Sequence, residues 1–152
     1  MEVYLTKSQL GLFPSDAETQ AWYDKIKSGE VVRGEFKKVR NYPFLKKYFA
    51  LLNVGFDNWE PGPVTSKHGW PEKNFERFRS DIIILCGYYD TVIRLDGSVR
   101  IEAQSVSFAK MTEEQFSELY NKTINVLLKH VYDSNMTAEA LDNIVNAYMS
   151  FA

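Results

Sequence analysis

The feature that most constrains this chain is an apolar repeat within residues 42–59, YPFLKKYFALLNVGFDNW. Apolar side chains recur there every three or four residues, at Leu45, Tyr48 or Phe49, Leu52, Phe56 and Trp59. This spacing predicts an α-helix of about four turns with one apolar stripe. Pro43 suits the first helical position, and either Asn41 or Tyr42 can take the N-cap position. We expect the rest of the fold to be organised around this helix.

The residues just before the helix make this region strongly basic. Residues 31–39 are rich in β-branched and apolar residues interrupted by charges, which predicts a strand. Residues 31–56 hold a single acid, Glu35, and six basic residues, a local net charge of +5 in a chain of net charge −2: Arg33, Lys37, Lys38, Arg40, Lys46 and Lys47. Such polarity suits an anionic partner, although a solvated strand and helix face explains the composition equally well.

The length and composition indicate an ordinary globular protein. A chain of 152 residues with 45% hydrophobic and 25% charged residues fits one domain with a real core. The single cysteine, Cys86, excludes an intrachain disulfide, and it follows the run Ile82–Leu85, where we expect a buried thiol. We see neither a signal peptide nor a bilayer-spanning apolar run, so the cytoplasm is the expected location.

The first thirty residues predict a hairpin and a short helix. Residues 3–6 and 11–13 are the expected strands. Ser15 and Glu18 have the spacing of a capping box, and Ser28-Gly29 would end the helix.

The later residues predict one more hairpin and three helices. Residues 73–90 favour a helix, with a buried strand over 82–86 as the competing interpretation. Thr112 and Gln115 form a second capping box before a long helix, and Thr137 caps a last helix over 138–149. We therefore predict a single α+β domain over residues 1–152, with two short β-hairpins or a small antiparallel sheet, about five helices, and long C-terminal helices.

The register of the second hairpin, 91–95 with 99–103, can be argued from its side chains. A two-residue Asp96-Gly97 loop would place Arg94 opposite Val99. A three-residue loop, 96–98, aligns Ile93 with Ile101 and Leu95 with Val99, and leaves Arg94, Arg100 and Glu102 on the other face. The second register is therefore expected, with the four apolar residues facing the core.

Residues 60–72, EPGPVTSKHGWPE, contain three of the five prolines and predict a long loop. Lys67, His68 and Trp70 make it a candidate contact surface, and a plain connector is the equal alternative. The two histidines of the chain, His68 and His130, share no ligand spacing, so no metal or cofactor is expected.

One hairpin arrangement has the order found in metal-dependent nucleases. Asp96 precedes Glu102-Ala103-Gln104, whereas such enzymes carry an acid and then an acid-x-lysine triplet. Gln104 takes the place of the lysine, and the Asp-Gly turn accounts for Asp96 by itself. A nuclease is therefore a minor alternative, and we expect no catalytic residues.

Three segments carry a resemblance to a family of uncharacterised proteins of tailed phages and prophages. They are FKKVRNYPFLKKYFALLNVGFDNWE, KNFERFRSDIIILCGYYD and RLDGSVRIEAQSVSFAKM. The order of features also resembles, more distantly, the Orf (NinB) family of phage lambda recombination mediators. The corresponding features here are Arg40-Asn41 entering a helix, a second helix, a strand ending in Gln104-Ser105-Val106-Ser107, and a long C-terminal helix.

The resemblance implies a homodimer that binds single-stranded or branched DNA during phage recombination, beside the host single-strand-binding protein or a recombinase. The residues expected to contact phosphates are Arg33, Lys37, Lys38, Arg40, Asn41, Lys46 and Lys47, with Lys67, Arg77 and Arg79 at the rim. Base-stacking candidates are Tyr42, Trp59 and Trp70. The alternative class is a phage inhibitor or adaptor that binds a host replication or defence protein.

Overall fold

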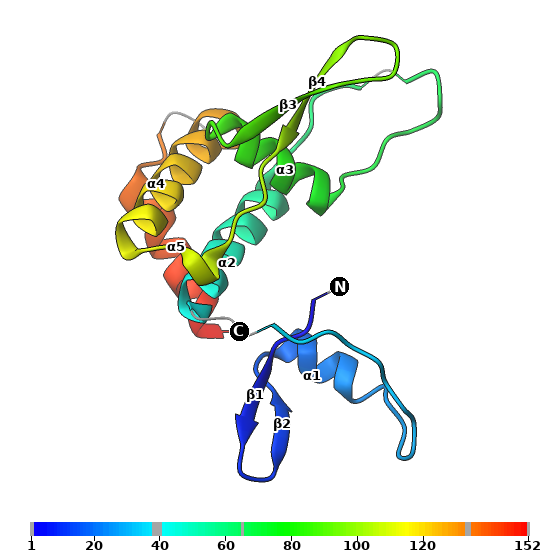
Figure 1. Cartoon of the computed structure of the whole chain (residues 1–152). Coiled ribbons are helices and arrows are strands. Elements are labelled where there is room, and N and C mark those ends of the chain that lie inside the picture. Colours follow the sequence, from blue (N-terminus) through cyan, green and yellow to red (C-terminus); the bar gives the residue numbers. More distant parts are fainter. Residues whose placement is uncertain (1, 38–40, 65, 133–134, 152) are drawn as a thin grey trace. The chain divides into compact units, whose positions relative to one another are not determined.

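A computed structural model describes residues 2–37, 41–64, 66–132 and 135–151 (Figure 1). Within these ranges it has five α-helices and two two-stranded antiparallel sheets, which confirms the predicted α+β class. The chain forms two compact units, one of residues 1–37 with 151–152 and one of residues 38–150. A single domain over residues 1–152 stays a prediction.

The smaller unit contains the first predicted hairpin and helix. Strand β1 (Leu5–Ser8) pairs with β2 (Gly11–Pro14), so that Leu5 lies opposite Pro14 and Ser8 opposite Gly11. Helix α1 (Ala17–Tyr23) follows. Thr19 is buried and its hydroxyl accepts a hydrogen bond from the Tyr4 N–H at 3.0 Å, which ties α1 to the start of the hairpin.

The cap predicted for this short helix was wrong by one residue. Asp16, not Ser15, is the N-cap, and its carboxylate accepts a hydrogen bond from the Thr19 N–H at 2.7 Å. Ser15 instead belongs to the hairpin, because its hydroxyl lies 2.6 Å from that of Thr6 and its N–H donates to the Tyr4 carbonyl.

The strand predicted over residues 31–39 is not present in the part of that range that is described. Residues 31–37 have no regular secondary structure, and residues 38–39 lie outside the described ranges. A strand needs a neighbour for its backbone hydrogen bonds, and among the described residues no strand pairs with residues 31–37. Val31, Val32 and Phe36 are consequently exposed rather than packed.

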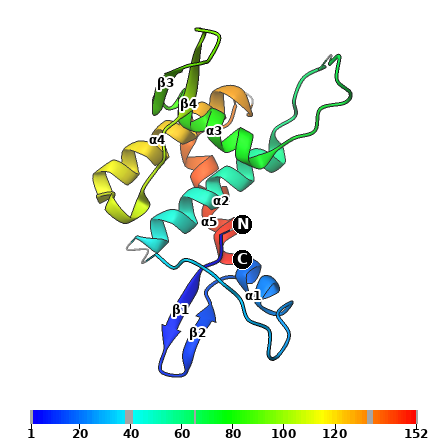
Figure 2. The same ribbon diagram turned by 45° about the vertical axis from the view of Figure 1, so that its right-hand side comes forward.

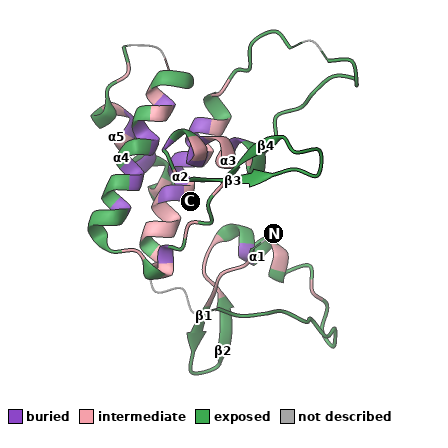
Figure 3. Ribbon diagram, turned by 45° about the horizontal axis from the view of Figure 1, so that its top comes forward, coloured by how far each residue is buried: buried purple, intermediate pink, exposed green. Residues whose placement is uncertain are grey.

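The larger unit is built on four helices: α2 (Tyr42–Asn58), α3 (Phe75–Leu85), α4 (Glu113–His130) and α5 (Ala138–Phe151) (Figures 1 and 2). Their inward faces hold the buried residues of the unit (Figure 3). The predicted stripe of α2 faces the core, with Tyr48 and Leu52 buried, but the buried face is wider than predicted and includes Leu51 and Val54. On α5, Leu141 and Val145 are buried whereas Ile144 and Tyr148 are exposed.

Helices α2 and α4 run in the same direction. Contacts between them advance together along both chains, from the Phe44–Phe116 ring stack at 4.4 Å, through the Thr123 hydroxyl donating to that of Tyr48 at 3.2 Å, to Gly55 beside Leu127. Two parallel helices cannot be joined by a short turn. The chain returns from the end of α2 to the start of α4 through the loop after α2, helix α3 and the second hairpin.

Side chains fix where these helices begin. Asn41 is the N-cap of α2, one of the two predicted alternatives, but its amide donates outside the helix, to the carbonyls of Phe108 at 3.0 Å and Met111 at 2.7 Å. These carbonyls belong to the 3₁₀ helix η1 (Phe108–Lys110) and the residue after it. Thr112 and Gln115 form the predicted capping box of α4, with both reciprocal hydrogen bonds present.

Residues 82–85 are helical, which confirms the helix over the competing strand, but the helix ends earlier than predicted. Gly87 has a φ of +92°, a conformation that favours glycine, and turns the chain out of α3. Tyr89, which the prediction included in the helix, begins strand β3 (Tyr89–Ile93). Cys86 is buried, as predicted.

Strand β3 pairs with β4 (Val99–Ala103) in a register two residues away from the predicted one. Ile93 lies opposite Val99 and Thr91 opposite Ile101. The loop is Leu95-Asp96-Gly97: the Gly97 N–H donates to the Arg94 carbonyl, and Gly97 has a φ of +83°, as in a type I turn with a bulge.

The prediction for this hairpin placed the side chains on the correct faces of the sheet, but it was wrong that the apolar face is buried. A shift of two residues keeps Ile93, Val99 and Ile101 on one face and Arg100 and Glu102 on the other. Ile93, Val99 and Ile101 are exposed, however, because the turn end of the hairpin projects beyond the helices (Figure 2), whereas Ala103, at the base of the same face, is half-buried against the core.

Gly55 gives a test of the contact between α2 and α4. A Cβ at this position would lie 2.7 Å from Cδ2 of Leu127, which is fully buried. Alanine is the better helix former by about 1 kcal/mol, but overpacking costs about 1–3 kcal/mol. We expect Gly55→Ala to lower the free energy of unfolding, measured by urea denaturation.

The exposed helical position Asp57 supplies the control, because Asp57→Ala should leave the stability unchanged or raised. Leu127→Ala should cost less in the Gly55→Ala background than alone, since the added methyl group fills part of the cavity. Additive effects of the two substitutions would contradict a direct contact.

Candidate nucleic-acid interface

The two units divide the predicted phosphate-contacting residues between them. Arg33 and Lys37 belong to the smaller unit, and Lys38 and Arg40 lie outside the described residues. The remaining members belong to the larger unit: Asn41, Lys46, Lys47, Lys67, Arg77 and Arg79. One continuous groove through all of them therefore stays a prediction, and each group is described within its own unit.

Lys47 is engaged in contacts between helices. Its ammonium lies 3.3 Å from the Asp142 carboxylate of α5 and 4.7 Å from the centre of the Tyr120 ring of α4. The Tyr120 hydroxyl also donates to Asp142, at 2.6 Å. This hydrogen bond, followed by the charge of Lys47, lowers the pKa of Asp142. Lys47 thus joins α2 to α4 and α5 and has less freedom to meet a phosphate than the sequence suggested.

Arg77 and Arg79, expected at the rim, form ion pairs along α3. Arg77 lies 2.9 Å from Asp81, and Arg79 lies 3.1 Å from Glu76 with its guanidinium 5.5 Å from the centre of the Phe49 ring. Such exposed pairs contribute little stability, so a phosphate could compete with the carboxylates. Arg79 is the more constrained of the two because of its ring contact.

Lys46 and Asn41, the other predicted phosphate-contacting residues at α2, differ in the contacts that they make. Lys46 is half-buried and takes part in no ion pair found within the described ranges. The Asn41 amide already donates both to Phe108 and to Met111. Its place in the sequence pattern is therefore explained by the junction between α2 and η1.

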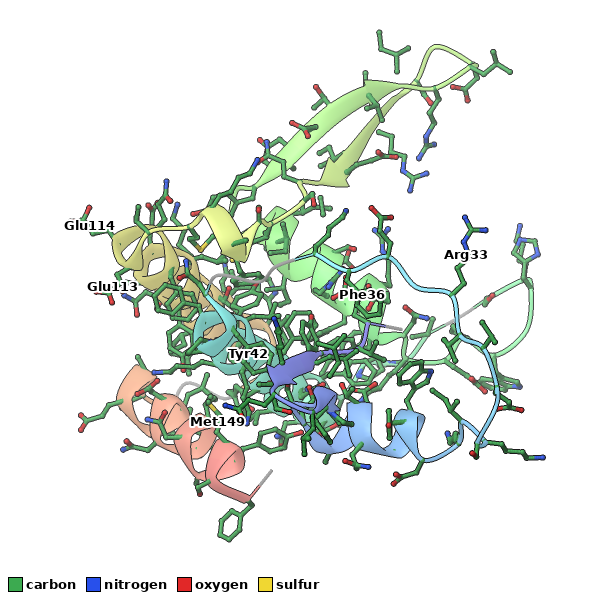
Figure 4. All side chains as sticks on the ribbon, turned by 60° about the horizontal axis from the view of Figure 1, so that its bottom comes forward. Arg33, Phe36, Tyr42, Glu113, Glu114 and Met149 are labelled. Atoms are coloured by element: carbon green, nitrogen blue, oxygen red, sulfur yellow. The ribbon has the colours of Figure 1, made fainter. Side chains whose placement is uncertain are left out.

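The smaller unit places two cations and an aromatic ring on one exposed segment, residues 31–37, which we call the 31–37 segment. Arg33 and Lys37 are exposed and enter no ion pair within the described part of the chain. Phe36 lies between them and is 67% exposed (Figure 4). Phe36 was not among the predicted contact residues, because residues 31–39 were predicted to form a strand, in which an aromatic ring would be packed.

The base-stacking candidates differ in how exposed their rings are. Trp59 is the C-cap of α2, and the centre of its ring lies 5.3 Å from that of the Phe78 ring. It packs against the core, as its place at the end of the apolar stripe indicated. Tyr42 is the first residue of α2 and is half-buried. Trp70 is 93% exposed, in the loop that also holds exposed Lys67 and His68. Trp70 is thus the tryptophan of the set that a base could reach.

A lysine not predicted from the sequence closes the end of α2. Lys73 donates to the carbonyls of Phe56 and Trp59, both at 2.8 Å, and its ammonium lies 4.8 Å from the Phe56 ring centre. This cation satisfies the free carbonyls of a helix C-terminus. The signal lies across a long loop, so helical periodicity could not have found it.

The residues of the nuclease alternative have other contacts. The Asp96 carboxylate accepts from the Ser98 N–H and hydroxyl, which lowers its pKa and confirms its role in the turn. Glu102 pairs with Arg100 at 3.2 Å, and the Gln104 amide donates to Asp90. Among the described residues no cluster of three metal-ligating His, Cys, Asp or Glu side chains occurs.

Acidic side chains mark a surface that is unfavourable for anionic ligands. Glu113 and Glu114 occupy the first turn of α4 and project outward from it (Figure 4). They interact favourably with the helix dipole and would repel phosphates.

The contacts of Lys47 and Asp142 predict a pH dependence. Because the pKa of Asp142 is lowered in the folded chain, its carboxylate stabilises the fold above its ordinary pKa of about 3.9 and loses that contribution as the pH falls. We expect the stability advantage of the unmodified chain over Asp142→Asn to shrink between about pH 5 and pH 2. At pH 7, Lys47→Gln should cost about 0.5–1 kcal/mol by chemical denaturation, and the matched Lys46→Gln close to nothing. Equal losses for the two lysines would contradict the assigned contact.

Known proteins provide three comparisons for this chain. No curated protein matches the chain, and no solved structure matches it. Within the described residues, no helix combines the length and apolar character needed to cross a membrane. A family model matches residues 2–70 and 65–151, nearly the whole chain. The chain therefore belongs to the family described as "Protein of unknown function (DUF1367)".

Proposed function

We propose that this protein binds single-stranded or branched DNA without catalysis, as an accessory of phage recombination in the cytoplasm of the host bacterium. The observation that supports this most is the 31–37 segment, on which Arg33, Phe36 and Lys37 are all exposed. Proteins that bind single strands without reading sequence combine cations for the phosphates with aromatic rings for the bases. The 31–37 segment supplies both within a few residues.

A second exposed segment has the same combination of residues. The loop after α2 carries Lys67 and Trp70, and Trp70 has almost no contact with the rest of the chain. The exposed Trp70 ring is accessible to a base, and base stacking on an aromatic side chain is worth about 1–3 kcal/mol. Lys67 and Trp70 are therefore proposed as a separate point of contact with DNA, within the larger unit.

The net charge of −2 limits how the DNA can be bound. Phosphates would be drawn to the local basic segments and repelled from acidic turns such as that of Glu113 and Glu114. This favours a narrow track along one strand over broad coverage of a duplex. The host single-strand-binding protein or a recombinase is proposed as a further partner on the same strand.

The alternative function, an inhibitor or adaptor acting on a host replication or defence protein, is favoured by the exposed apolar face of the β3–β4 hairpin. The two functions respond differently to salt. Phosphate contacts release counterions and weaken steeply with salt, whereas an apolar contact does not.

The proposal predicts a result for charge reversal in the 31–37 segment. Arg33→Glu with Lys37→Glu should weaken binding to a fluorescent oligothymidine at least tenfold, or about 1.4 kcal/mol, in fluorescence anisotropy. The magnitude of the slope of log affinity against log salt should fall by about 1.4, because two phosphate contacts to a single strand are lost. Phe36→Ala should weaken binding while leaving the salt slope unchanged.

The matched control is Lys25→Glu with Lys27→Glu, which makes the same change of charge on exposed residues of the same unit. It should retain most of the affinity. An equal loss in both pairs would show that net charge alone governs binding. Absence of binding to single-stranded, duplex and forked DNA at low salt would overturn the proposed function.

A further inference from the structure

The β3–β4 hairpin presents features that its own unit does not use. Its apolar face is open to solvent, with Ile93 81%, Val99 64% and Ile101 49% exposed. Among the described residues no third strand pairs with either of its edges. Proteins usually protect such edges with charged side chains, above all lysine, with proline or with a bulge. Val99–Ala103 contains no lysine, proline or bulge, and its two charges, Arg100 and Glu102, are opposite in sign. An isolated two-stranded sheet is also marginally stable.

The hydrogen bonds between β3 and β4 show which backbone groups of the hairpin point outward. The Arg94 N–H donates to the Ser98 carbonyl, and the Gln104 N–H donates to the Tyr88 carbonyl. Hydrogen-bonded pairs alternate along an antiparallel ladder, so even-numbered residues of β4 bond to β3. The N–H and C=O groups of Val99, Ile101 and Ala103 therefore point to the free edge of β4.

The sequence of β4, Val-Arg-Ile-Glu-Ala, is complementary to itself about its central residue. In an antiparallel pair centred on Ile101, the two copies of Ile101 face each other and Val99 faces the second copy's Ala103. Arg100 then faces the second copy's Glu102, and by symmetry Glu102 faces the second copy's Arg100. Apolar residues meet on one face and opposite charges meet on the other.

We propose that two copies of this chain pair through the free edges of β4, in the register centred on Ile101, to form a continuous four-stranded antiparallel sheet. The outward groups of the odd-numbered residues are the ones that this register joins, with up to about six backbone hydrogen bonds. The contact is isologous, so it closes as a dimer and leaves no further β4 edge.

Charge selects β4 over the other edge of the hairpin. The equivalent pairing of β3 would centre on Thr91 and place Asp90 opposite the second copy's Val92. The Asp90 carboxylate would then face no cation. This pairing would also put a threonine pair, in place of an isoleucine pair, at the centre. The pairing of β4 makes no use of the 31–37 segment, so assembly and DNA binding can succeed or fail separately.

Light scattering tests the assembly, with the DNA titration as a separate readout. The unmodified chain should have twice its mass of 17.6 kDa at tens of micromolar. Arg100→Glu alone and Glu102→Arg alone each bring like charges together across the pair and should shift the mass to that of the monomer. Both are exposed positions, and circular dichroism should show each variant folded.

Mixing the two single variants distinguishes contact between copies from contact within one strand. Arg100 and Glu102 also pair within β4, so each single variant loses that contact as well. In a mixed dimer, however, the substituted residues again face opposite charges across the interface. The mixture should recover the dimer mass although neither variant does so alone, and a mixture that stays monomeric would overturn the register.

Cysteine cross-linking gives an independent test of the central residue. Directly opposed residues of a hydrogen-bonded antiparallel pair lie about 5.5 Å apart, which a disulfide can span. Ile101→Cys should give a covalent dimer under mild oxidation, and the control Thr91→Cys, on the other edge, should not. A monomeric unmodified chain, a dimer unaffected by the charge substitutions, or cross-linking by Thr91→Cys alone would each overturn the proposal.

Discussion

The larger unit depends on the close approach of α2 and α4. Gly55 lets the two backbones come together at Leu127, and the Phe44–Phe116 stack closes the other end of the contact. Between them, the Thr123 hydroxyl donates to that of Tyr48, and the Cys86 thiol lies 3.5 Å from Thr123. Among the described residues, no buried side-chain nitrogen or oxygen lacks a hydrogen-bond partner. This polar contact therefore fixes the relative position of three elements at little cost in desolvation.

The cations of the chain illustrate a competition between structural and binding roles. Lys47, Lys73 and Arg79 each have a carboxylate, a carbonyl or a ring within reach, and each joins elements of the larger unit. Lys46 and the cations of the 31–37 segment have no such engagement in the described part of the chain. A count of basic residues treats these two kinds alike, and only the fold separates them. The number of phosphates that the protein can neutralise is correspondingly smaller than the charge of residues 31–56 suggests.

Local rules predicted the elements whose causes are local. The capping box at Thr112, the helix from Tyr42 and the Asp96 turn were found in the sequence because each depends on residues within one or two turns. Two local features were still predicted wrongly, the cap at Ser15 and the register of the β3–β4 turn. Other predictions failed where a distant partner decides the outcome. Residues 31–37 have strand-like composition but no neighbour, and the hairpin has the right alternation but no core beneath it. The contacts of Lys47 with Asp142 and of Lys73 with Trp59 lie beyond any periodicity.

The burial of Cys86 gives the molecule a single internal reporter of its own opening. Desolvation raises the pKa of this thiol, although its hydrogen bond with the Thr123 hydroxyl opposes the effect, so little of it is the reactive thiolate. As the chain has no other cysteine, a thiol reagent added to the native protein can react only when the packing around the end of α3 opens. The labelling rate then measures the free energy of that opening without any engineered probe. Ligands that stabilise the larger unit would slow the reaction, and ligands confined to the smaller unit would leave it unchanged.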